Sequence, residues 1–525
     1  MSSDAGPPVR SFHPLLLNYV SSRPGGWWIH RVAPFSVNED PVAALRGLEK
    51  IVRSMPRTEI VVATDTRLYA VCRTRLMRFR DDLEFRYTPE DGVVHVRSAS
   101  RVGIFDFGVN RRRVERVRKA FTQRRGTGRT RLFPRGARIT VEALAGDPYP
   151  LFHELRAAEP VTWVPALRMW MLTRRDDIVR VLADWERFTT DAPASTIRDI
   201  FGSHMLTTDG ERQIRYKRRF IGPFRRGNLE RNLLGTVRAV LDGLMEELEG
   251  GPRRAADLRA RLARPLSVRS ICRVLGLPEP DGPRLLAWYD DFAAALENFT
   301  GDPEVRGRGQ IAAREFGAYV TPFLQGQRPV PEGSTIAELR TDAEPLAEAE
   351  MVANLLIVLF GGIETTESAI ASAIWAALSH RMPSRLPAKD ADRLDDVFEE
   401  SLRWDAAVQS CTRFTTEPVE IRGVRIPAGE TVQCMLGAAN RDPAHFEDPD
   451  RFNPDRPNAR DHLSFGAGRH FCLGATLARI EAREALARVF RLPGLRLDPE
   501  RPSRPHGHEF RAPPGVWVVW DEKLN

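Results

Sequence analysis

The ten residues from Phe465 to Gly474 (FGAGRHFCLG) constrain this chain more than any other stretch. They place Cys472 in a glycine-rich loop that leads into an amphipathic pattern from Cys472 to about Phe490, which predicts a helix. A cysteine at a helix N-terminus lies near unpaired backbone N–H groups and the positive end of the helix dipole, and both favour the thiolate. Glycines allow a backbone to approach a ligand closely. The stretch therefore predicts a thiolate donating to a flat cofactor packed on the loop, although a lone cysteine would more often be a small buried residue.

A second chemical landmark lies in the apolar helix predicted around Met351–His380. It contains Gly361 and Gly362, followed by Glu364 and Thr365. Two glycines inside a helix cost about 1 kcal/mol each relative to alanine. A tight helix crossing would explain them, but so would a site for dioxygen, where the glycines provide space and local distortion. Because reductive O–O cleavage also needs a proton route, the adjacent carboxylate and hydroxyl favour the oxygen site.

The F-x-x-G-x-x-x-C-x-G spacing resembles the haem-binding loop of the cytochrome P-450 family, and the resemblance extends from about Asp147 to the C-terminus. It implies a mainly α fold, the cytochrome P-450 fold with a small β subdomain, preceded here by a small α+β domain. It also implies haem b, with the iron bound by Cys472, and O2 as co-substrate. Glu364 and Thr365 match the family's catalytic acid and hydroxyl positions. The cofactor-binding residues implied by position are Gln213, Lys217, Gly361, Gly362, Arg413, Phe465, Gly468, His470, Cys472 and Gly474.

A further part of the resemblance is structural. Glu400 and Arg403 lie three residues apart on one face of a predicted helix and resemble the family's E-x-x-R pair. Arg456 matches the arginine that completes this triad. These three residues are expected to hold the scaffold on the haem side and to take no part in catalysis.

The resemblance implies a monooxygenase that inserts one oxygen atom from O2 into an organic small molecule, by hydroxylation or epoxidation, in secondary metabolism. Electrons would come from NAD(P)H through a ferredoxin reductase and a ferredoxin. A peroxygenase, an isomerase or dehydratase that needs no external electrons, and a non-catalytic haem-binding scaffold remain open. The substrate does not follow from the sequence. The basic residues expected to dock an acidic ferredoxin are Lys217, Arg218, Arg219, Arg225 and Arg226.

Charge divides the chain into two parts. Residues 1–138 carry 27 Lys and Arg against 13 Asp and Glu, about +14, whereas the whole chain carries +8. We predict a small α+β domain at 1–121, a basic linker at 122–138 and the P-450 domain at 139–525. Segments at 18–22, 79–82 and 97–111 resemble a bacterial domain family of unknown function. The arginine-rich linker lacks interleaved aromatic residues, so no nucleic-acid partner is expected.

Cysteine use and hydropathy indicate the compartment. The five cysteines are scattered and odd in number, which favours a reducing cytosol over a disulfide framework or a zinc site. The first twelve residues lack the apolar stretch of a signal peptide. The most apolar segment, 351–363, is too short to span a bilayer. We therefore expect a cytoplasmic protein without a membrane span.

Overall fold

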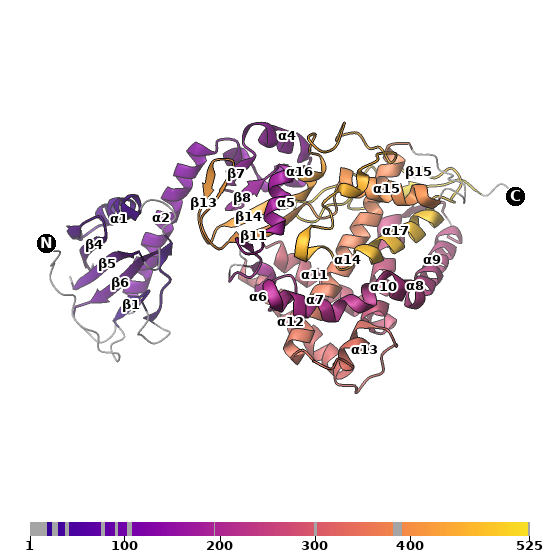
Figure 1. Ribbon diagram of the computed structural model, residues 1–525, viewed down its shortest axis with the longest axis horizontal. Helices are drawn as coiled ribbons and strands as arrows, with labels where there is room; N and C mark the ends of the chain where they lie inside the picture. The colour runs from indigo at the N-terminus through magenta and orange to yellow at the C-terminus, as the bar shows by residue number, and fades with distance from the viewer. Residues whose placement is uncertain are drawn as a thin grey trace. The chain divides into compact units, whose positions relative to one another are not determined.

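The chain forms two compact units, Met1–Pro134 and Arg135–Asn525, in the computed structural model (Figure 1). The structure describes residues 18–23, 30–36, 41–74, 79–89, 93–101, 108–193, 195–251, 253–298, 302–381 and 391–522.

The first unit is an antiparallel sheet with two helices. Its sheet has the strand order β1-β6-β5-β4-β3, and β2 also pairs with β6. Alternating apolar residues of the strands pack against α1 and α2 around a core that includes Leu48, Phe85 and Phe121. The elements are β1 (Tyr19–Ser21), β2 (Phe35–Ser36), α1 (Pro41–Ser54), β3 (Thr58–Ala63), β4 (Arg67–Arg73), β5 (Arg80–Thr88), β6 (Val93–Ser100) and α2 (Val109–Leu132).

Buried polar groups tie this first unit together. Arg113 pairs with Asp81 at 2.5 Å, and both side chains are buried. Asn110 Nδ2 donates to the Asn18 carbonyl at 2.9 Å, and Ser98 Oγ donates to Asn110 Oδ1 at 2.8 Å. The polar residues that resemble the uncharacterised family therefore interlock the sheet and α2.

Helix α2 continues through most of the segment predicted as a linker. It ends at Leu132 and includes Gly126 and Gly128. Arginine is a good helix former, and two glycines cost only about 1 kcal/mol each, so the helix continues.

The second unit is mainly helical. Its helices are α3 (Val141–Ala145), α4 (Tyr149–Ala158), α5 (Arg175–Ala183), α6 (Thr196–Phe201), α7 (Gly210–Phe224), α8 (Arg226–Asn232), α9 (Leu234–Glu249), α10 (Arg264–Leu275), α11 (Gly282–Leu296), α12 (Pro303–Leu324), α13 (Thr335–Arg340), α14 (Glu348–Ser379), α15 (Ala391–Trp404), α16 (Leu436–Asn440) and α17 (Ala475–Val489). Short helical turns are η2 (Gly136–Arg138), η3 (Arg259–Ala263), η4 (Glu279–Asp281), η6 (Ala459–Asp461) and η7 (Gly468–His470).

Small sheets flank these helices. One has the order β7-β8-β14-β11-β9, in which β8 and β14 run parallel and the other pairs are antiparallel. A three-stranded sheet has the order β10-β16-β15, and β12 pairs with β13. The strands are β7 (Val161–Val164), β8 (Met169–Leu172), β9 (Phe188–Thr189), β10 (Ala255–Asp257), β11 (Ser410–Thr415), β12 (Val419–Ile421), β13 (Val424–Ile426), β14 (Thr431–Met435), β15 (Arg496–Leu497) and β16 (Trp517–Val519).

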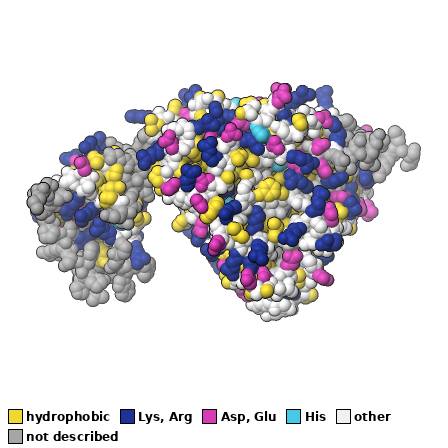
Figure 2. Space-filling model, in the orientation of Figure 1, with side chains coloured by type: hydrophobic (Ala, Val, Ile, Leu, Met, Phe, Trp, Pro, Cys, Tyr) yellow, Lys and Arg dark blue, Asp and Glu magenta, His cyan; other side chains and the backbone are white. Residues whose placement is uncertain are grey.

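Helix α14 is the centre of the second unit's core and contacts α10, α12, α15 and α17 (Figure 1). Its length and composition would suit a membrane span, but 78% of its most apolar window is buried within the protein. A helix that is apolar nearly all round is expected in the middle of a large domain. On the face seen in Figure 2, basic and acidic side chains are interspersed over the surface of the second unit.

Candidate haem-binding cavity

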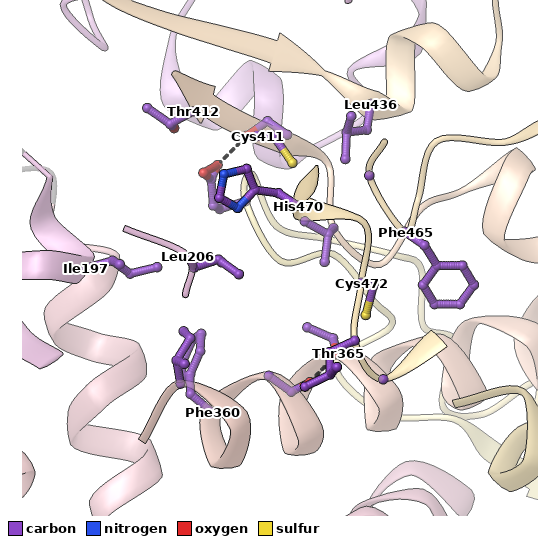
Figure 3. Close-up of a pocket in the computed structure, with 18 of the residues that line it drawn as sticks. Ile197, Leu206, Phe360, Thr365, Cys411, Thr412, Leu436, Phe465, His470 and Cys472 are labelled. Carbon is purple, nitrogen blue, oxygen red and sulfur yellow. Dashed lines mark hydrogen bonds between the residues drawn. The ribbon is translucent and has the colours of Figure 1, made fainter. Parts of the chain in front are cut away.

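A cavity of about 460 Å³ lies in the second unit, and its wall is mostly apolar. One side of it is formed by α14, with Phe360, Gly361 and Thr365, and another by the loop that carries His470 and Cys472. Figure 3 shows Thr365 on its helix below this loop, with Ile197 and Leu206 on a further wall. Two stretches more than one hundred residues apart in the sequence thus face the same space.

The cysteine loop is held by its own backbone. The Cys472 N–H donates to the Phe465 carbonyl at 2.9 Å, and helix α17 begins at Ala475, three residues later than predicted. Gly468 has φ +67°, and a Cβ there would lie 2.9 Å from the Leu182 carbonyl oxygen of α5. The loop therefore needs glycine at this position to pack against α5.

The electrostatic environment of Cys472 differs from the expectation. Burial raises the pKa of its thiol, and the backbone N–H of Gly474, the charges of Lys217 and Arg479 and the N–H of Ala475 oppose that rise. The net pKa lies above the usual value. The N–H groups at the helix terminus lower the pKa as expected, but desolvation of a charged sulfur outweighs their contribution.

His470 is oriented by a carboxylate that sequence reasoning missed. Its Nε2 lies 2.8 Å from Asp209 Oδ1, at the start of α7, and its buried Nδ1 has no hydrogen-bond partner among the described residues. Burial lowers the pKa of His470 while Asp209 raises it, and the pKa stays below its usual value. Asp209 also accepts from the hydroxyls of Thr189 and Thr190, at 2.7 and 3.1 Å.

Two predicted residues of α7 hold the loop itself. Gln213 Nε2 donates to the Arg469 carbonyl at 3.1 Å. Lys217 Nζ donates to the carbonyls of Arg469 and Phe471, both at 2.8 Å. Both residues line the cavity, and burial lowers the pKa of Lys217. Their donors thus fix the backbone on either side of His470.

Arg413, on β11, is buried at the cavity wall. It is 5% exposed, and its Nη1 donates to the Thr412 carbonyl at 2.8 Å. Within the described part of the chain, no carboxylate pairs with Arg413. A buried guanidinium with unused donors is suited to an anionic ligand.

The two glycines of α14 differ in their surroundings. A Cβ at Gly361 would meet no atom within 4 Å, whereas a Cβ at Gly362 would lie 2.6 Å from Ile271 of α10. Gly361 thus leaves open space beside the cavity, and Gly362 permits a tight helix crossing. Neither glycine interrupts the helix, because α14 runs continuously from Glu348 to Ser379.

The side chains of Thr365 and Glu364 lie in different environments, the cavity and a polar network. Thr365 lines the cavity, and its Oγ1 donates to the Gly361 carbonyl at 2.6 Å. Glu364 is not among the lining residues: its Oε1 accepts from Arg259 at 3.1 Å and its Oε2 from the Tyr289 hydroxyl at 2.8 Å. Arg259 also pairs with the buried Glu367 at 2.7 Å. The carboxylate therefore sits behind the hydroxyl in a charged network that the sequence did not indicate.

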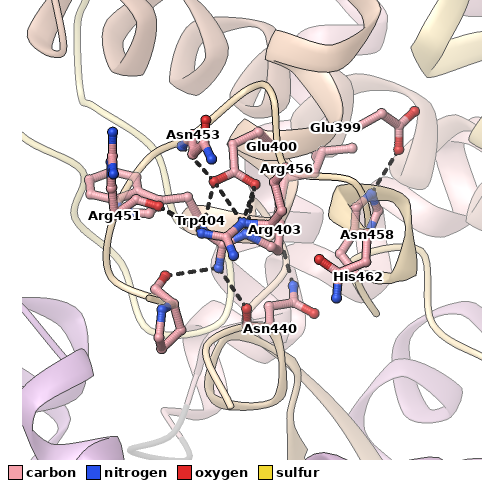
Figure 4. A network of polar contacts seen from close by, with 12 residues as sticks. Glu399, Glu400, Arg403, Trp404, Asn440, Arg451, Asn453, Arg456, Asn458 and His462 are labelled. Atoms are coloured by element: carbon pink, nitrogen blue, oxygen red, sulfur yellow. Dashed lines mark hydrogen bonds and ion pairs between the residues drawn. The ribbon is translucent and has the colours of Figure 1, made fainter. Parts of the chain in front are cut away.

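Glu400 and Arg403 are on α15, and Arg456 lies beside them (Figure 4). Arg403 Nε and Nη2 donate to the two oxygens of Glu400 at 2.7 and 2.8 Å, and neither side chain is exposed. Arg456 Nε lies 3.4 Å from the same carboxylate. The remaining donors of Arg403 go to the carbonyls of Asn440 and Pro449, both at 2.9 Å, and of Arg451 at 3.2 Å.

Two cavity carboxylates were not predicted. Glu297 follows the end of α11, and Glu509 lies in the loop before β16; both line the cavity. Neither lies in a motif, so the only signal in the sequence was a charged residue next to an apolar segment.

The residues present fit a haem. The cavity combines an open space at Gly361, a cysteine at its wall, and the cationic or donor groups of Arg413 and His470, of which His470 Nδ1 lacks a partner. A flat ligand with a metal centre and two carboxylates would use all of these groups.

Comparisons with known proteins agree with this site. Residues 389–513 match the family Cytochrome P450, and residues 18–121 match the Protein of unknown function (DUF1499) family. The chain is 37% identical to the cytochrome P450 monooxygenase PikC of Streptomyces venezuelae, over 67% of this chain and 86% of that protein. It is 33% identical to the mycinamicin IV hydroxylase/epoxidase of Micromonospora griseorubida, over 70% and 94%. The crystal structure of CalO2 matches with a TM-score of 0.65 at 30% identity, over 73% of this chain and 99% of that one.

Fold, cavity and comparisons together define a haem enzyme that activates O2. The chain belongs to the cytochrome P450 family and carries a DUF1499 domain at its N-terminus. The predicted family, fold class and monooxygenase class are thereby confirmed.

Proposed function

We propose that this monooxygenase hydroxylates or epoxidises a secondary metabolite held in the cavity between α14 and the cysteine loop, with Cys472 as the iron ligand. The observation that carries the proposal is that Cys472 and Thr365 line one cavity. Relatives named for mycinamicin IV, 6-deoxyerythronolide B and polyketide biosynthesis support a substrate from secondary metabolism.

Haem b, when bound, supplies the iron centre at which O2 is activated, and a cysteine ligand favours O–O cleavage. The chain's own residues bind and orient this group. We assign Arg413 and His470 to the two haem carboxylates, since both present buried donors at the cavity wall. Gln213 and Lys217 act mainly through the loop carbonyls that they hold, and Phe465, Gly468 and Gly474 shape the loop.

Protons reach the cavity by way of α14. Thr365 Oγ1 lies on the cavity, and Glu364 lies behind it in contact with Arg259 and Tyr289. We assign Thr365 as the hydroxyl that passes a proton into the cavity and Glu364 as the group that supplies it. Gly361 leaves the space that dioxygen needs.

The direct test is the spectrum of the purified, reduced protein under carbon monoxide. The full chain should show the red-shifted Soret band of a thiolate ligand, and Cys472→Ala should lose it. Cys411 also lines the cavity, so Cys411→Ala is the matched control and should keep the band. A band that survives Cys472→Ala would contradict the proposal.

We further propose a ferredoxin as the electron donor. Among the basic residues expected to dock it, Arg219 forms ion pairs with Asp342 and Glu344, and its side chain is only 9% exposed. Arg218 and Arg225 are exposed. Arg218→Glu with Arg225→Glu should slow reduction by an acidic ferredoxin about tenfold at low salt, because steering depends on charge. Arg425→Glu, exposed on β13, is the control. Turnover without NAD(P)H would contradict an external electron supply.

We assign residues 139–525 to the catalytic domain and the enzyme to the cytoplasm. Five free cysteines, none in a disulfide, support a reducing compartment. Equal activity of residues 139–525 and the full chain with the same ferredoxin would show that the N-terminal domain takes no part in electron transfer.

A further inference from the structure

The cavity has a polar corner opposite its apolar walls. Glu509 Oε2 accepts from Ser410 Oγ at 2.7 Å and from Gln433 Nε2 at 3.2 Å, and Gln433 Nε2 also donates to Ser410 Oγ at 3.0 Å. Ser410 and Gln433 are 4% and 1% exposed. Neutral, buried donors thus fix the position of the Glu509 carboxylate at the cavity wall.

This corner has more acceptors than donors. No described residue donates to Gln433 Oε1, and its amide cannot be turned round without removing the donor that faces Glu509. Glu297 lines the same cavity, and no described residue donates to its carboxylate or pairs with it. Of the two carboxylates, the serine hydroxyl and the glutamine amide thus serve Glu509 alone, and among the described residues Glu297 has no donor.

Among the residues that the structure describes, no cation pairs with these carboxylates. Lys217 and Arg413 line the cavity, but within the described chain neither pairs with Glu297 or Glu509. His508 Nδ1 lies 4.0 Å from Glu509, yet burial lowers the pKa of His508 to about 4, so it is neutral near pH 7. Burial raises the pKa of Glu509 to about 7, and Glu297 adds to that rise. A cation entering this corner would relieve both the burial of charge and the repulsion between the carboxylates.

We propose that Glu297 and Glu509 form a cation subsite within the substrate cavity, and that the substrate is an apolar molecule bearing a protonated aliphatic amine. The amine lies in the polar corner, and the apolar skeleton lies along α14 and the walls formed by Ile197 and Leu206. This inference rests on the proposed function, since it assigns the substrate class of the same cavity.

The test compares matched ligands on the haem-loaded full chain. A panel of tertiary amines on alkyl, aromatic and steroid skeletons is measured by equilibrium dialysis at pH 8, each against its neutral amide; one pair is N,N-dimethyl-4-phenylbutylamine and N,N-dimethyl-4-phenylbutanamide. Dialysis reports binding without relying on a change at the iron. Amines that fit should bind about tenfold more tightly than their amides, as expected for one charge-assisted contact.

Variants assign the preference to the two carboxylates. Glu297→Gln and Glu509→Gln should each weaken amine binding about fivefold or more and leave amide binding unchanged. Glu420→Gln, exposed on β12, should change neither. Since Glu509 is anchored to β11 and its loss risks the fold, Glu297→Gln serves as the second, independent variant.

The outcomes separate this inference from the proposed function. If no amine in the panel binds more tightly than its amide, or if neither variant reduces the preference, the cation subsite is wrong. The carbon monoxide spectrum of the same samples reports the thiolate-bound haem, so a normal spectrum would leave the proposed function standing.

Discussion

Replacing Arg403 by lysine tests how much a buried guanidinium contributes beyond its charge. All five N–H donors of Arg403 are used: two on Glu400 and three on the carbonyls of Asn440, Pro449 and Arg451. A lysine keeps the positive charge but has three donors. At least two of these five hydrogen bonds would therefore be lost, although Glu400 and the Arg451 carbonyl also accept from Arg456.

The expected loss is large for one conservative substitution. A hydrogen bond from a charged group contributes about 1.5–3 kcal/mol, so the loss of two should reduce the free energy of unfolding of Arg403→Lys by about 3–6 kcal/mol. The same helix offers a matched control, because Arg393 pairs with Asp455 at 2.8 Å while 39% of its side chain is exposed. Exposed ion pairs contribute about 0–1 kcal/mol, so Arg393→Lys should have little effect.

Urea unfolding followed by tryptophan fluorescence measures both variants. Eight of the ten tryptophans follow residue 134, so the signal reports mainly the second unit. The midpoint and slope of each curve give the free energy of unfolding. If Arg403→Lys lay within about 0.5 kcal/mol of the wild type, or equal to Arg393→Lys, the count of buried donors would not explain the role of the triad.

Three further predictions follow from individual contacts. Gly361→Ala should leave the free energy of unfolding unchanged or raise it, whereas Gly362→Ala should lower it by about 1–3 kcal/mol, as measured by urea unfolding, because only the second Cβ meets a neighbour, at 2.6 Å. Burial raises the pKa of Glu399, but hydrogen bonds to His462 and an arginine hold it at about 2, so this carboxylate stabilises the fold above pH 4.5 and loses that contribution as pH falls toward 2. Glu399→Gln should therefore lower stability at pH 7 and hardly at pH 2, as measured by urea midpoints at each pH. Arg113→Met leaves the buried Asp81 without its partner and should destabilise the first unit by about 3–5 kcal/mol, seen by calorimetry as a lower transition for that unit and an unchanged one for the second.

The sequence predicted the elements whose signal is local. Apolar periodicity and flanking turn residues predict strands at 59–63, 68–74, 82–87 and 93–98 and a helix at 40–55. The structure has each of them within two residues of these bounds. Of the hairpin turn that the sequence predicts at 89–92, residues 90–92 lie outside the described residues. The segment at 122–138 was predicted poorly, since its glycines suggested a break that the surrounding arginines prevent.

The sequence predicted those site residues that lie in a recognisable motif. Cys472, Gly361 and Thr365 share one cavity as the motifs indicated. What the sequence did not reveal were contacts between distant segments: Asp209 with His470, and Arg259 with Glu364, which are 105 residues apart. Such pairs depend on how helices cross, and neither partner lies in a pattern that specifies the other.

The glycines of the cysteine loop show why a correct motif does not by itself give the reason for its residues. We expected them to let the backbone approach a cofactor. At Gly468 the close neighbour is instead the Leu182 carbonyl of α5, and φ is +67°, so a side chain would be strained and would also push the loop away from α5. At Gly474 the nearest atom to an added Cβ is the Cys472 sulfur at 3.9 Å, an ordinary contact distance. The first glycine therefore fixes where the loop sits on the protein, and the position of the cysteine sulfur follows from that packing.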